Sequence, residues 1–372
     1  MKSSKCFTGN IILLCSVCVV MSFLSQIFKV NPIVNLVYAA SLVLVFVCYF
    51  MSGYVSKLMM FLIIDAIIAA IINDIVIDSV DYYLHILIML CTYICIEVGV
   101  YANVNVKAYK SISIMFLLMS LIFLVAYYFG PLKSTYFRWT DDICLNFPNP
   151  NAAGLWLVCI FILLFYCSFL YKKSLRVAFL IAAAAIVPII FKTDSRNSYF
   201  ACFLLVIGAI ITKIFKIKKV PNWCLAVFAC LPLIVFFFYM FVMVKNMDFW
   251  ENLLSLESVD KGIDSRQGIW QRVLDNFWNC FLFGDYHRYY NSQLHNSLIT
   301  IYCRFGAPAT VAVCILIYRA LKNLQERSSF YAALSLGAIL FTGCFEASVF
   351  VGIAGLYLML LIIPACASVE QT

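Results

Sequence analysis

Apolar runs of about 20 residues, separated by short polar or basic stretches, recur along the entire sequence. A helix needs about 20 mostly apolar residues to cross a bilayer, so this pattern predicts an all-α integral membrane protein with about 12 transmembrane helices. The first run is too long for a signal peptide and no small-residue cleavage site follows it, so we count it as a helix. The expected spans cover residues 8–28, 33–51, 58–77, 82–102, 111–130, 150–171, 175–192, 197–215, 220–244, 296–320, 329–344 and 348–366.

Composition agrees with a membrane protein and argues against a soluble globular one. Hydrophobic residues make up 65% of the chain and charged residues 12%, with a mean hydropathy of +0.99, whereas soluble domains carry about 25% charged residues. We find no internal repeat, which weakens a secondary transporter as an alternative because such proteins often contain one. Residues 1–372 are therefore expected to form a single polytopic membrane domain.

The basic residues predict the orientation of the spans, because cytoplasmic loops carry an excess of Lys and Arg. With the N-terminus inside, fifteen basic residues fall in inner segments and five in short outer loops. Both termini are therefore expected in the cytoplasm. The net charge of +8 comes mostly from these inner basic residues, so it does not indicate nucleic acid as a partner.

The 17 cysteines do not predict a disulfide framework or a zinc site. Most of them lie inside expected spans, where cysteine behaves as a small apolar residue. No CxxC pair lies outside a membrane segment, and such pairs are typical of zinc sites. We therefore expect no metal site and no cofactor.

A large outer loop at about 245–295, between spans 9 and 10, interrupts the pattern. It holds seven of the 18 acidic residues and two of the three histidines, and loops of this length are usually functional or disordered. Its many aromatic residues argue against disorder. Part of it has helical period, which predicts an amphipathic helix in the outer membrane interface, capped by Asp264 or Ser265 and ended by Gly284. The apolar side comprises Trp270, Val273, Leu274, Phe277, Trp278 and Phe281, and the polar side comprises Gln271, Arg272, Asp275 and Asn279.

The chain returns to the membrane at His295, and Pro308 follows soon after. Because proline lacks an N–H and interrupts a helix, we expect a short half-helix from about 295 to 305 and then the true span. Non-helical backbone at membrane depth is tolerated where it lines a cavity or is buried in protein, so His295 is expected at the mouth of a cavity. The alternative is a histidine at a polar interface without a chemical role.

Two further outer segments carry polar residues at helix starts. Arg196 opens a span directly after a tight turn, where a helix N-terminus and an arginine can together bind an anion; the alternative is an arginine that reaches lipid headgroups. Pro150 opens the sixth span and is followed by small residues, which favours close helix packing. Asn149 or Asn151 could cap this helix.

Together these motifs resemble the superfamily of O-antigen ligases and Wzy-type surface polysaccharide polymerases. The order of the motifs, their shared outer face and the twelve spans with both termini inside match that family. The resemblance covers about residues 110–320, and one departure is Asp194, where the family often has glycine before Ser-Arg. The motifs that carry it are Asn149-Pro150-Asn151, Ser195-Arg196, Ser265-Arg266 with Trp270, Phe283-Gly284, His295-Asn296-Ser297 and Phe305-Gly306.

The resemblance implies glycosyl transfer on the outer face of the bacterial cytoplasmic membrane, from a glycan on undecaprenyl pyrophosphate to a sugar hydroxyl. Arg196 and Arg266 would stabilise the pyrophosphate leaving group without a metal, and His295 would accept the proton of the acceptor. Partners would be the lipid-linked donor and acceptor, the bilayer, and flippase and chain-length regulator proteins. We also expect substrate binding by Asn149, Asn151, Trp270, Arg288 and Asn296.

Four functions remain open at this point, and one of them is a passive assembly partner in the same pathway, for which no outer arginine or histidine would be essential. A polymerase is favoured over a ligase, which would transfer the glycan to lipid A core or protein, because the outer loop is modest in length. A flippase or exporter of lipid-linked oligosaccharide would need charges along a central path, and the embedded acids available for it are Asp65, Glu97 and Glu346.

Overall fold

The computed structural model describes residues 32–51, 55–72, 80–101, 106–130, 145, 147, 150–243, 268–289, 294–327, 330–346 and 349. These residues form helices and turns, and no β-strand occurs among them. The helices are α2 (Pro32–Met51), α3 (Lys57–Ile72), α4 (Val80–Tyr101), α5 (Val106–Phe129), α6 (Pro150–Leu170), α7 (Lys173–Phe191), α8 (Arg196–Ile214), α9 (Asn222–Ala229), α10 (Leu231–Phe238), the π-helical turn η2 (Tyr239–Met243), the 3₁₀ turn η4 (Trp278–Cys280), α13 (Tyr286–Tyr289), α14 (Ser297–Arg327) and α15 (Phe330–Thr342).

Several of these helices have the length and apolar character needed to cross a membrane. Five qualify singly among the described residues, namely α5 from Ser111 onward, α6, α7, α8 and α14, and α9 with α10 would make a sixth, bent span. The chain is therefore a helical, multi-pass membrane protein. The count of twelve spans, the position of the termini and the type of membrane stay predictions. The expected first span and nearly all of the last lie outside the described residues.

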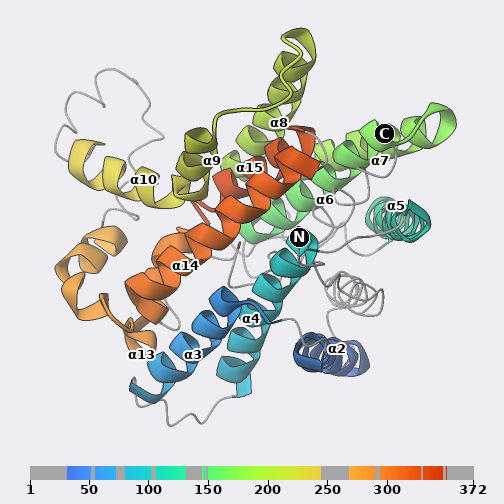
Figure 1. Cartoon of the computed structure of the whole chain (residues 1–372). Helices are drawn as coiled ribbons and strands as arrows, with labels where there is room; N and C mark the ends of the chain where they lie inside the picture. The colour runs from blue at the N-terminus through green and yellow to red at the C-terminus, as the bar shows by residue number, and fades with distance from the viewer. Residues whose placement is uncertain are drawn as a thin grey trace, which may run out of the picture.

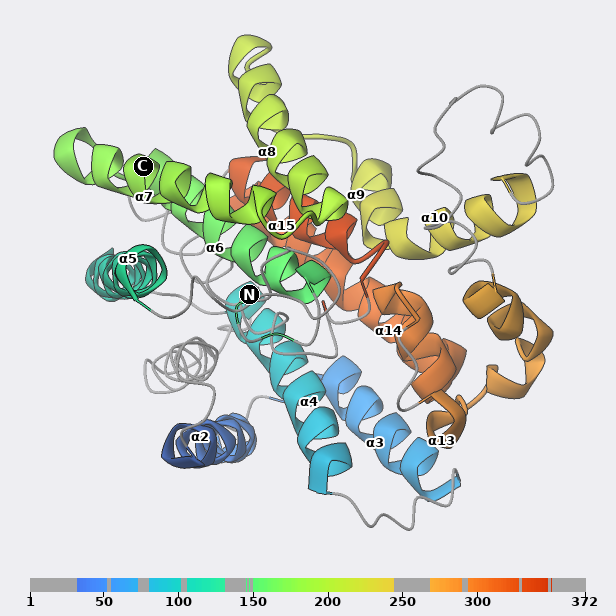
Figure 2. The same ribbon diagram turned by 180° about the vertical axis from the view of Figure 1, so that it is seen from behind.

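The segment 220–244, predicted as one span, is two helices that meet at 64°. Pro232 lies in the first turn of α10, and its ring nitrogen cannot donate the hydrogen bond that would continue α9. The backbone therefore turns at Cys230 (φ −95°, ψ 3°). Figure 2 shows α10 leaving α9 sideways toward the outer loop.

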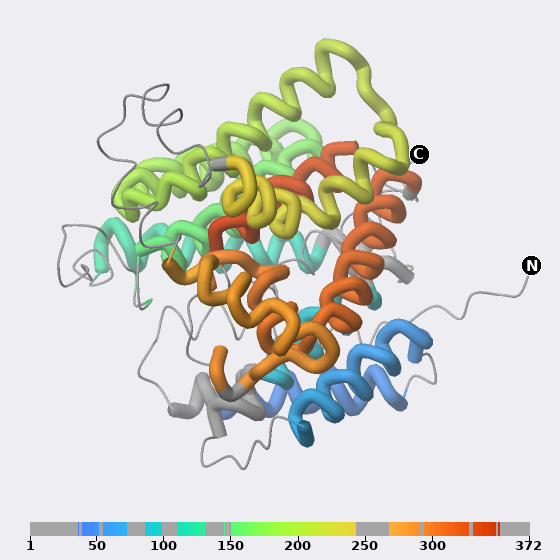
Figure 3. Tube along the Cα trace, turned by 90° about the vertical axis from the view of Figure 1, so that its left-hand side faces the viewer, coloured from blue at the N-terminus to red at the C-terminus, as the bar shows by residue number. Residues whose placement is uncertain are grey.

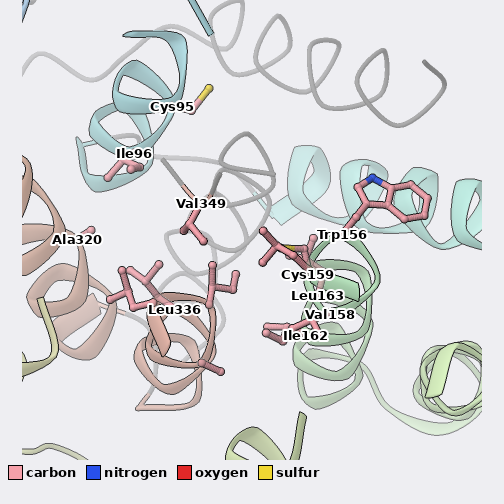
Figure 4. Close-up of a cluster of buried hydrophobic side chains, with 14 of the residues drawn as sticks. Cys95, Ile96, Trp156, Val158, Cys159, Ile162, Leu163, Ala320, Leu336 and Val349 are labelled. Atoms are coloured by element: carbon pink, nitrogen blue, oxygen red, sulfur yellow. The ribbon is translucent and has the colours of Figure 1, made fainter. Parts of the chain in front are cut away.

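Helix α6 is the centre of the bundle and is buried on nearly every side. It packs against α7, α8 and α15, and a helix that is apolar all round is expected in such a position. Figure 4 shows Trp156, Cys159 and Leu163 of α6 in the core that also contains Leu336 of α15. This core extends to α3 and α4.

Helix α14 lies beside α3, α4, α9 and α15 (Figure 1). Its helical path is broken at Gly306 (φ 88°, ψ 179°), two residues before Pro308. The predicted break after a short first helical part is thus confirmed, and the assignment of the part after the break as the true span stays a prediction. A second apolar cluster packs the segment 268–289 and α10 against the half-helix, and Figure 3 shows this segment, in orange, alongside α14.

Candidate functional site

The start of α14 joins three helix ends at one buried residue, Asn296, which is 0% exposed. Its amide nitrogen donates to the carbonyl of Pro232 in α10 (2.8 Å) and to that of Cys344 after α15 (3.2 Å). Its side-chain oxygen accepts from the backbone N–H of Ile299 (3.1 Å), which is a helix N-cap. We call this meeting point, formed by Asn296, Pro232 and Cys344, the Asn296 junction.

Ser297 adds two further bonds to the same connection. Its backbone N–H and its hydroxyl both donate to the carbonyl of Gly343, at 2.8 and 2.9 Å. A side chain at Gly343 would lie 2.5 Å from the Ser297 hydroxyl, so the close approach requires glycine. The end of α15 is thereby fixed against the start of α14.

Two of the helices near the Asn296 junction are short. The eight residues of α9 rise about 12 Å, and the 13 residues of α15 rise about 20 Å. Both lengths fall short of the hydrocarbon thickness of about 30 Å. Helices that end at membrane depth are typical of sites where polar ligands or ions bind, because non-helical backbone there must line a cavity or be buried in protein.

His295 precedes the junction in a left-handed conformation (φ 50°) and is half-buried. Asp194, which precedes Ser195-Arg196, is also left-handed (φ 46°). Such conformations are uncommon outside glycine and are enriched at functional sites. Aspartate is one of the few residues that tolerate this conformation, which glycine adopts freely.

Trp270 is held directly beside this site. It belongs to the helical residues 268–275, which we call the loop helix, and its ring N–H donates to the carbonyl of Leu294 at 2.7 Å. Trp270 is 1% exposed and its ring contacts Phe236 and Tyr239. The structure therefore brings Trp270 next to His295, although its buried ring has a clear packing role.

The predicted amphipathic helix is shorter than expected. Residues 276 and 277 form a turn and η4 follows, so the 3.6-residue period ends after residue 275. Val273 is buried as predicted, but Trp278 is 78% exposed and Phe281 41%. The expected polar side is exposed: Gln271, Arg272, Asp275 and Asn279. The expected caps, Asp264 and Ser265, lie outside the described residues.

Two glycines allow close backbone contact between the segment 268–289 and the break in α14. Gly284 (φ 69°) and Gly306 (φ 88°) are left-handed, and a Cβ on either would lie 2.3 Å from backbone atoms of the other segment, at Arg304 and Leu282. Two backbone hydrogen bonds join the same two segments: the Asp285 N–H donates to the Cys303 carbonyl (2.7 Å), and the Ala307 N–H donates to the Phe281 carbonyl (2.8 Å). Gly284 was predicted to end the amphipathic helix, but that helix already ends at residue 275, and Gly284 instead ends the turns that follow it.

Arg288 lies on α13, which is capped by Asp285 through its side-chain oxygen and the Arg288 N–H (3.1 Å). The Arg288 side chain is exposed and donates to Asn276. Nearby, Arg304 of the half-helix donates to the Tyr289 carbonyl (3.4 Å) and lies 5.8 Å from the Tyr286 ring. The two arginines and α13 thus belong to one packed unit.

Arg196 is exposed at the first position of α8. Its neighbour Ser195 is buried against α6, because a Cβ on Gly154 would lie 2.5 Å from both the Ser195 Cβ and the Ser198 hydroxyl. The predicted close packing after Pro150 is thus confirmed, and α6 does begin at Pro150. Helix α15 contacts both α8 and α14, but convergence of Arg196 with His295 stays a prediction.

The remaining predicted site residues are less constrained. Asn151 is half-buried in the first turn of α6. Asn149 and Arg266 lie outside the described residues, so their roles stay predictions. Sequence patterns had not singled out Pro232, Gly343 or Cys344, because their roles depend on carbonyl groups and contacts far apart in the chain. Glu346, 7% exposed and two residues beyond Cys344, had been considered only for a transport path.

Two titratable side chains of the segment 268–289 have shifted pKa values. A hydrogen bond with the Cys303 thiol lowers the pKa of the Cys280 thiol, and burial raises the pKa of Tyr289 to about 12. Within the described ranges, no group of three or more His, Cys, Asp or Glu side chains is placed to hold a metal ion. The acidic residues at 248–264 lie outside those ranges, so metal independence stays a prediction.

Comparisons with known proteins do not assign a family. No family model matches the chain, and neither a curated protein nor a solved structure matches it. The functional argument therefore rests on the residues and on the resemblance stated above.

Proposed function

We propose that the chain is a metal-independent glycosyltransferase that polymerises undecaprenyl-pyrophosphate-linked oligosaccharide repeat units on the outer face of the bacterial cytoplasmic membrane. The observation that carries the proposal is the Asn296 junction, where three helix ends meet beside His295 in a left-handed conformation. His295 is expected where the chain re-enters the membrane from the outer loop, which suits a substrate whose reacting pyrophosphate lies at the surface of the bilayer.

The chemistry requires a cation for the leaving group and a base for the acceptor. As the glycosidic bond to the donor breaks, negative charge accumulates on the lipid pyrophosphate, and Arg196 with Arg266 would stabilise it. His295 would take the proton of the attacking sugar hydroxyl. The products are a glycan longer by one repeat unit on one lipid carrier and free undecaprenyl pyrophosphate.

Exposed aromatic side chains in the segment 268–289 suit a carbohydrate substrate. Trp278 is 78% exposed and Phe281 41%, and their rings lie 5.6 Å apart. Aromatic faces offer flat apolar surfaces to sugar rings, and tryptophan is also favoured at membrane interfaces. We assign these two residues to sugar binding or to anchoring at the interface, and both roles agree with an outer location.

The decisive experiment is reconstitution of the purified protein with a purified lipid-linked repeat unit. A ladder of products is expected for a polymerase. Arg196→Lys and Arg266→Lys should each lose the ladder at normal protein level, because lysine keeps the charge but lacks the planar group that binds phosphate through two bonds. A full ladder in both variants would overturn the proposed mechanism.

The same experiment separates the ligase. A ligase would leave the lipid-linked repeat unit unpolymerised and would transfer the glycan once to an added lipid A core or protein acceptor. Because both activities use the same donor chemistry, the arginine variants would impair either one, and the acceptor alone distinguishes them.

A second candidate, a flippase, is favoured by one observation in α3. Asp65 is 5% exposed, and one of its carboxylate oxygens has no hydrogen-bond partner. Ionisable groups buried in membrane helices often mark transport paths. Movement of a fluorescent lipid-linked glycan across vesicles, lost in Asp65→Asn and without a new glycosidic bond, would support this function over the transferase.

A further inference from the structure

A wholly apolar cavity of about 260 Å³ lies between α8, α9, α14 and α15. Its walls include Ile211 of α8, Phe228 of α9, Leu321 of α14 and Leu334 of α15. Sites for small molecules usually measure about 300–1,000 Å³ and include some polar groups. This cavity is smaller and lacks polar side chains in its walls, so it suits a single hydrocarbon chain.

The cavity is built into the packing of the helices. A Cβ on Gly208 would lie 2.8 Å from the end of the Leu334 side chain, which would have to shift to admit a larger residue, whereas a Cβ on Gly337 would lie 3.8 Å from the Phe228 ring, in ordinary contact. One wall is fixed by Gln325, whose amide bonds both the N–H and the carbonyl of Val220 (2.8 and 2.9 Å). These contacts hold the walls of the cavity in place.

Four exposed lysines surround the turn between α8 and α9 at this end of the bundle, and Lys219 is directly followed by Val220 in the cavity wall. Within the described part of the chain, none of the four forms an ion pair; the salt bridge found there joins Lys322 to Glu326 at 3.9 Å. These four lysines are Lys213, Lys216, Lys218 and Lys219.

We propose that the cavity binds one acyl chain of an anionic glycerophospholipid, with the lipid phosphate against Lys216, Lys218 and Lys219. The charge of the turn selects an anionic headgroup over a zwitterionic one, since lysines at a membrane surface attract anionic lipids. The lysines lie near Gln325, at the end of α14 opposite to the Asn296 junction, whereas the cavity extends along α15 as far as Phe341, two residues before Gly343. The proposal does not depend on the proposed transferase function.

Native mass spectrometry of the purified full chain tests the proposal with dioleoyl phosphatidylglycerol and dioleoyl phosphatidylcholine offered at equal concentration. We expect phosphatidylglycerol to be retained at least about fivefold more, the factor that one surface lysine can supply. The combined variant Lys216→Gln, Lys218→Gln and Lys219→Gln should lose this preference. The matched control, Lys172→Gln with Lys173→Gln, changes exposed basic residues in a different turn and should keep it.

A second variant tests the cavity itself. Gly337→Leu adds a side chain toward Phe228 and should lower phosphatidylglycerol retention at least about fivefold, whereas Val311→Leu, on an exposed position of α14 outside the cavity, should not. If Gly337→Leu does not fold, the lysine variants still decide. Equal retention of the two lipids by the unchanged protein, or stronger retention of undecaprenyl phosphate than of phosphatidylglycerol, would overturn the proposal.

Discussion

Replacing Gly306 with alanine should release the outer segment from α14. The observed backbone (φ 88°, ψ 179°) lies in a region that is essentially restricted to glycine and costs other residues about 1–3 kcal/mol. The added Cβ would also lie 2.3 Å from the Leu282 carbonyl oxygen, so the neighbouring bond from Ala307 to Phe281 (2.8 Å) must break, at a net cost of about 1 kcal/mol. The contact should therefore weaken by about 2–4 kcal/mol in total.

Hydrogen–deuterium exchange measures this loss locally. The N–H of Asp285, bonded to the Cys303 carbonyl at 2.7 Å, reports on the same contact without being changed. If the contact opens locally, a loss of about 2–4 kcal/mol in its stability makes amide exchange about 30- to 900-fold faster in the peptide that contains Asp285.

Gly268→Ala provides the matched control, because a Cβ there meets no atom within 4 Å. Alanine is the better helix former, so this change should be neutral or stabilising by up to about 1 kcal/mol. Equal exchange at Asp285 in the Gly306→Ala and Gly268→Ala proteins would refute the role assigned to the two glycines.

Three further predictions concern the site and the topology. Asn296→Ala should destabilise the protein by about 2–5 kcal/mol, since it removes a helix cap and two buried hydrogen bonds, to the carbonyls of Pro232 and Cys344; a thermal melt unchanged from that of the unmodified protein would contradict this. His295→Ala should cut turnover by about 10²–10⁴ with little effect on donor binding, whereas Arg272→Ala on the exposed side of the loop helix should retain activity; equal loss in both would argue against a base at 295. In intact cells, an impermeant thiol reagent should label a cysteine placed at Ser258 but not one placed at Ser174, and the reverse pattern would invert the topology.

The sequence predicted those features of the fold that depend on local chemistry. Proline at a helix start, glycine at a helix end and proline after a break act through their own backbone. The start of α6 at Pro150 and the break in α14 near Pro308 were therefore predictable, as was the left-handed backbone of Gly284, although the helix that it was expected to end stops at residue 275.

Features that depend on long-range contacts were not predictable in the same way. Trp278 shares a helical period with Trp270, but the turn at 276–277 rotates it outward, so that it is 78% exposed. Likewise, Asn296 is recognisable as a helix cap, yet its hydrogen-bond partners Pro232 and Cys344 lie 64 and 48 positions away in the sequence. No periodicity encodes such distances. The break between α9 and α10 was missed for a different reason, because Pro232 acts locally but lies in an uninterrupted apolar run that was interpreted as one span.

The Asn296 junction has a consequence for biogenesis. Ser297 bonds to Gly343, which lies 46 positions later in the chain, and ribosomes add about 5–20 residues per second. The start of α14 must therefore wait about 2–9 s after its own synthesis for the residues that complete it. During that interval the polar groups of Asn296 and Ser297 lack their partners from beyond α15, so a nascent chain arrested before residue 343 would present an unfinished helix start to the insertion machinery and to membrane proteases.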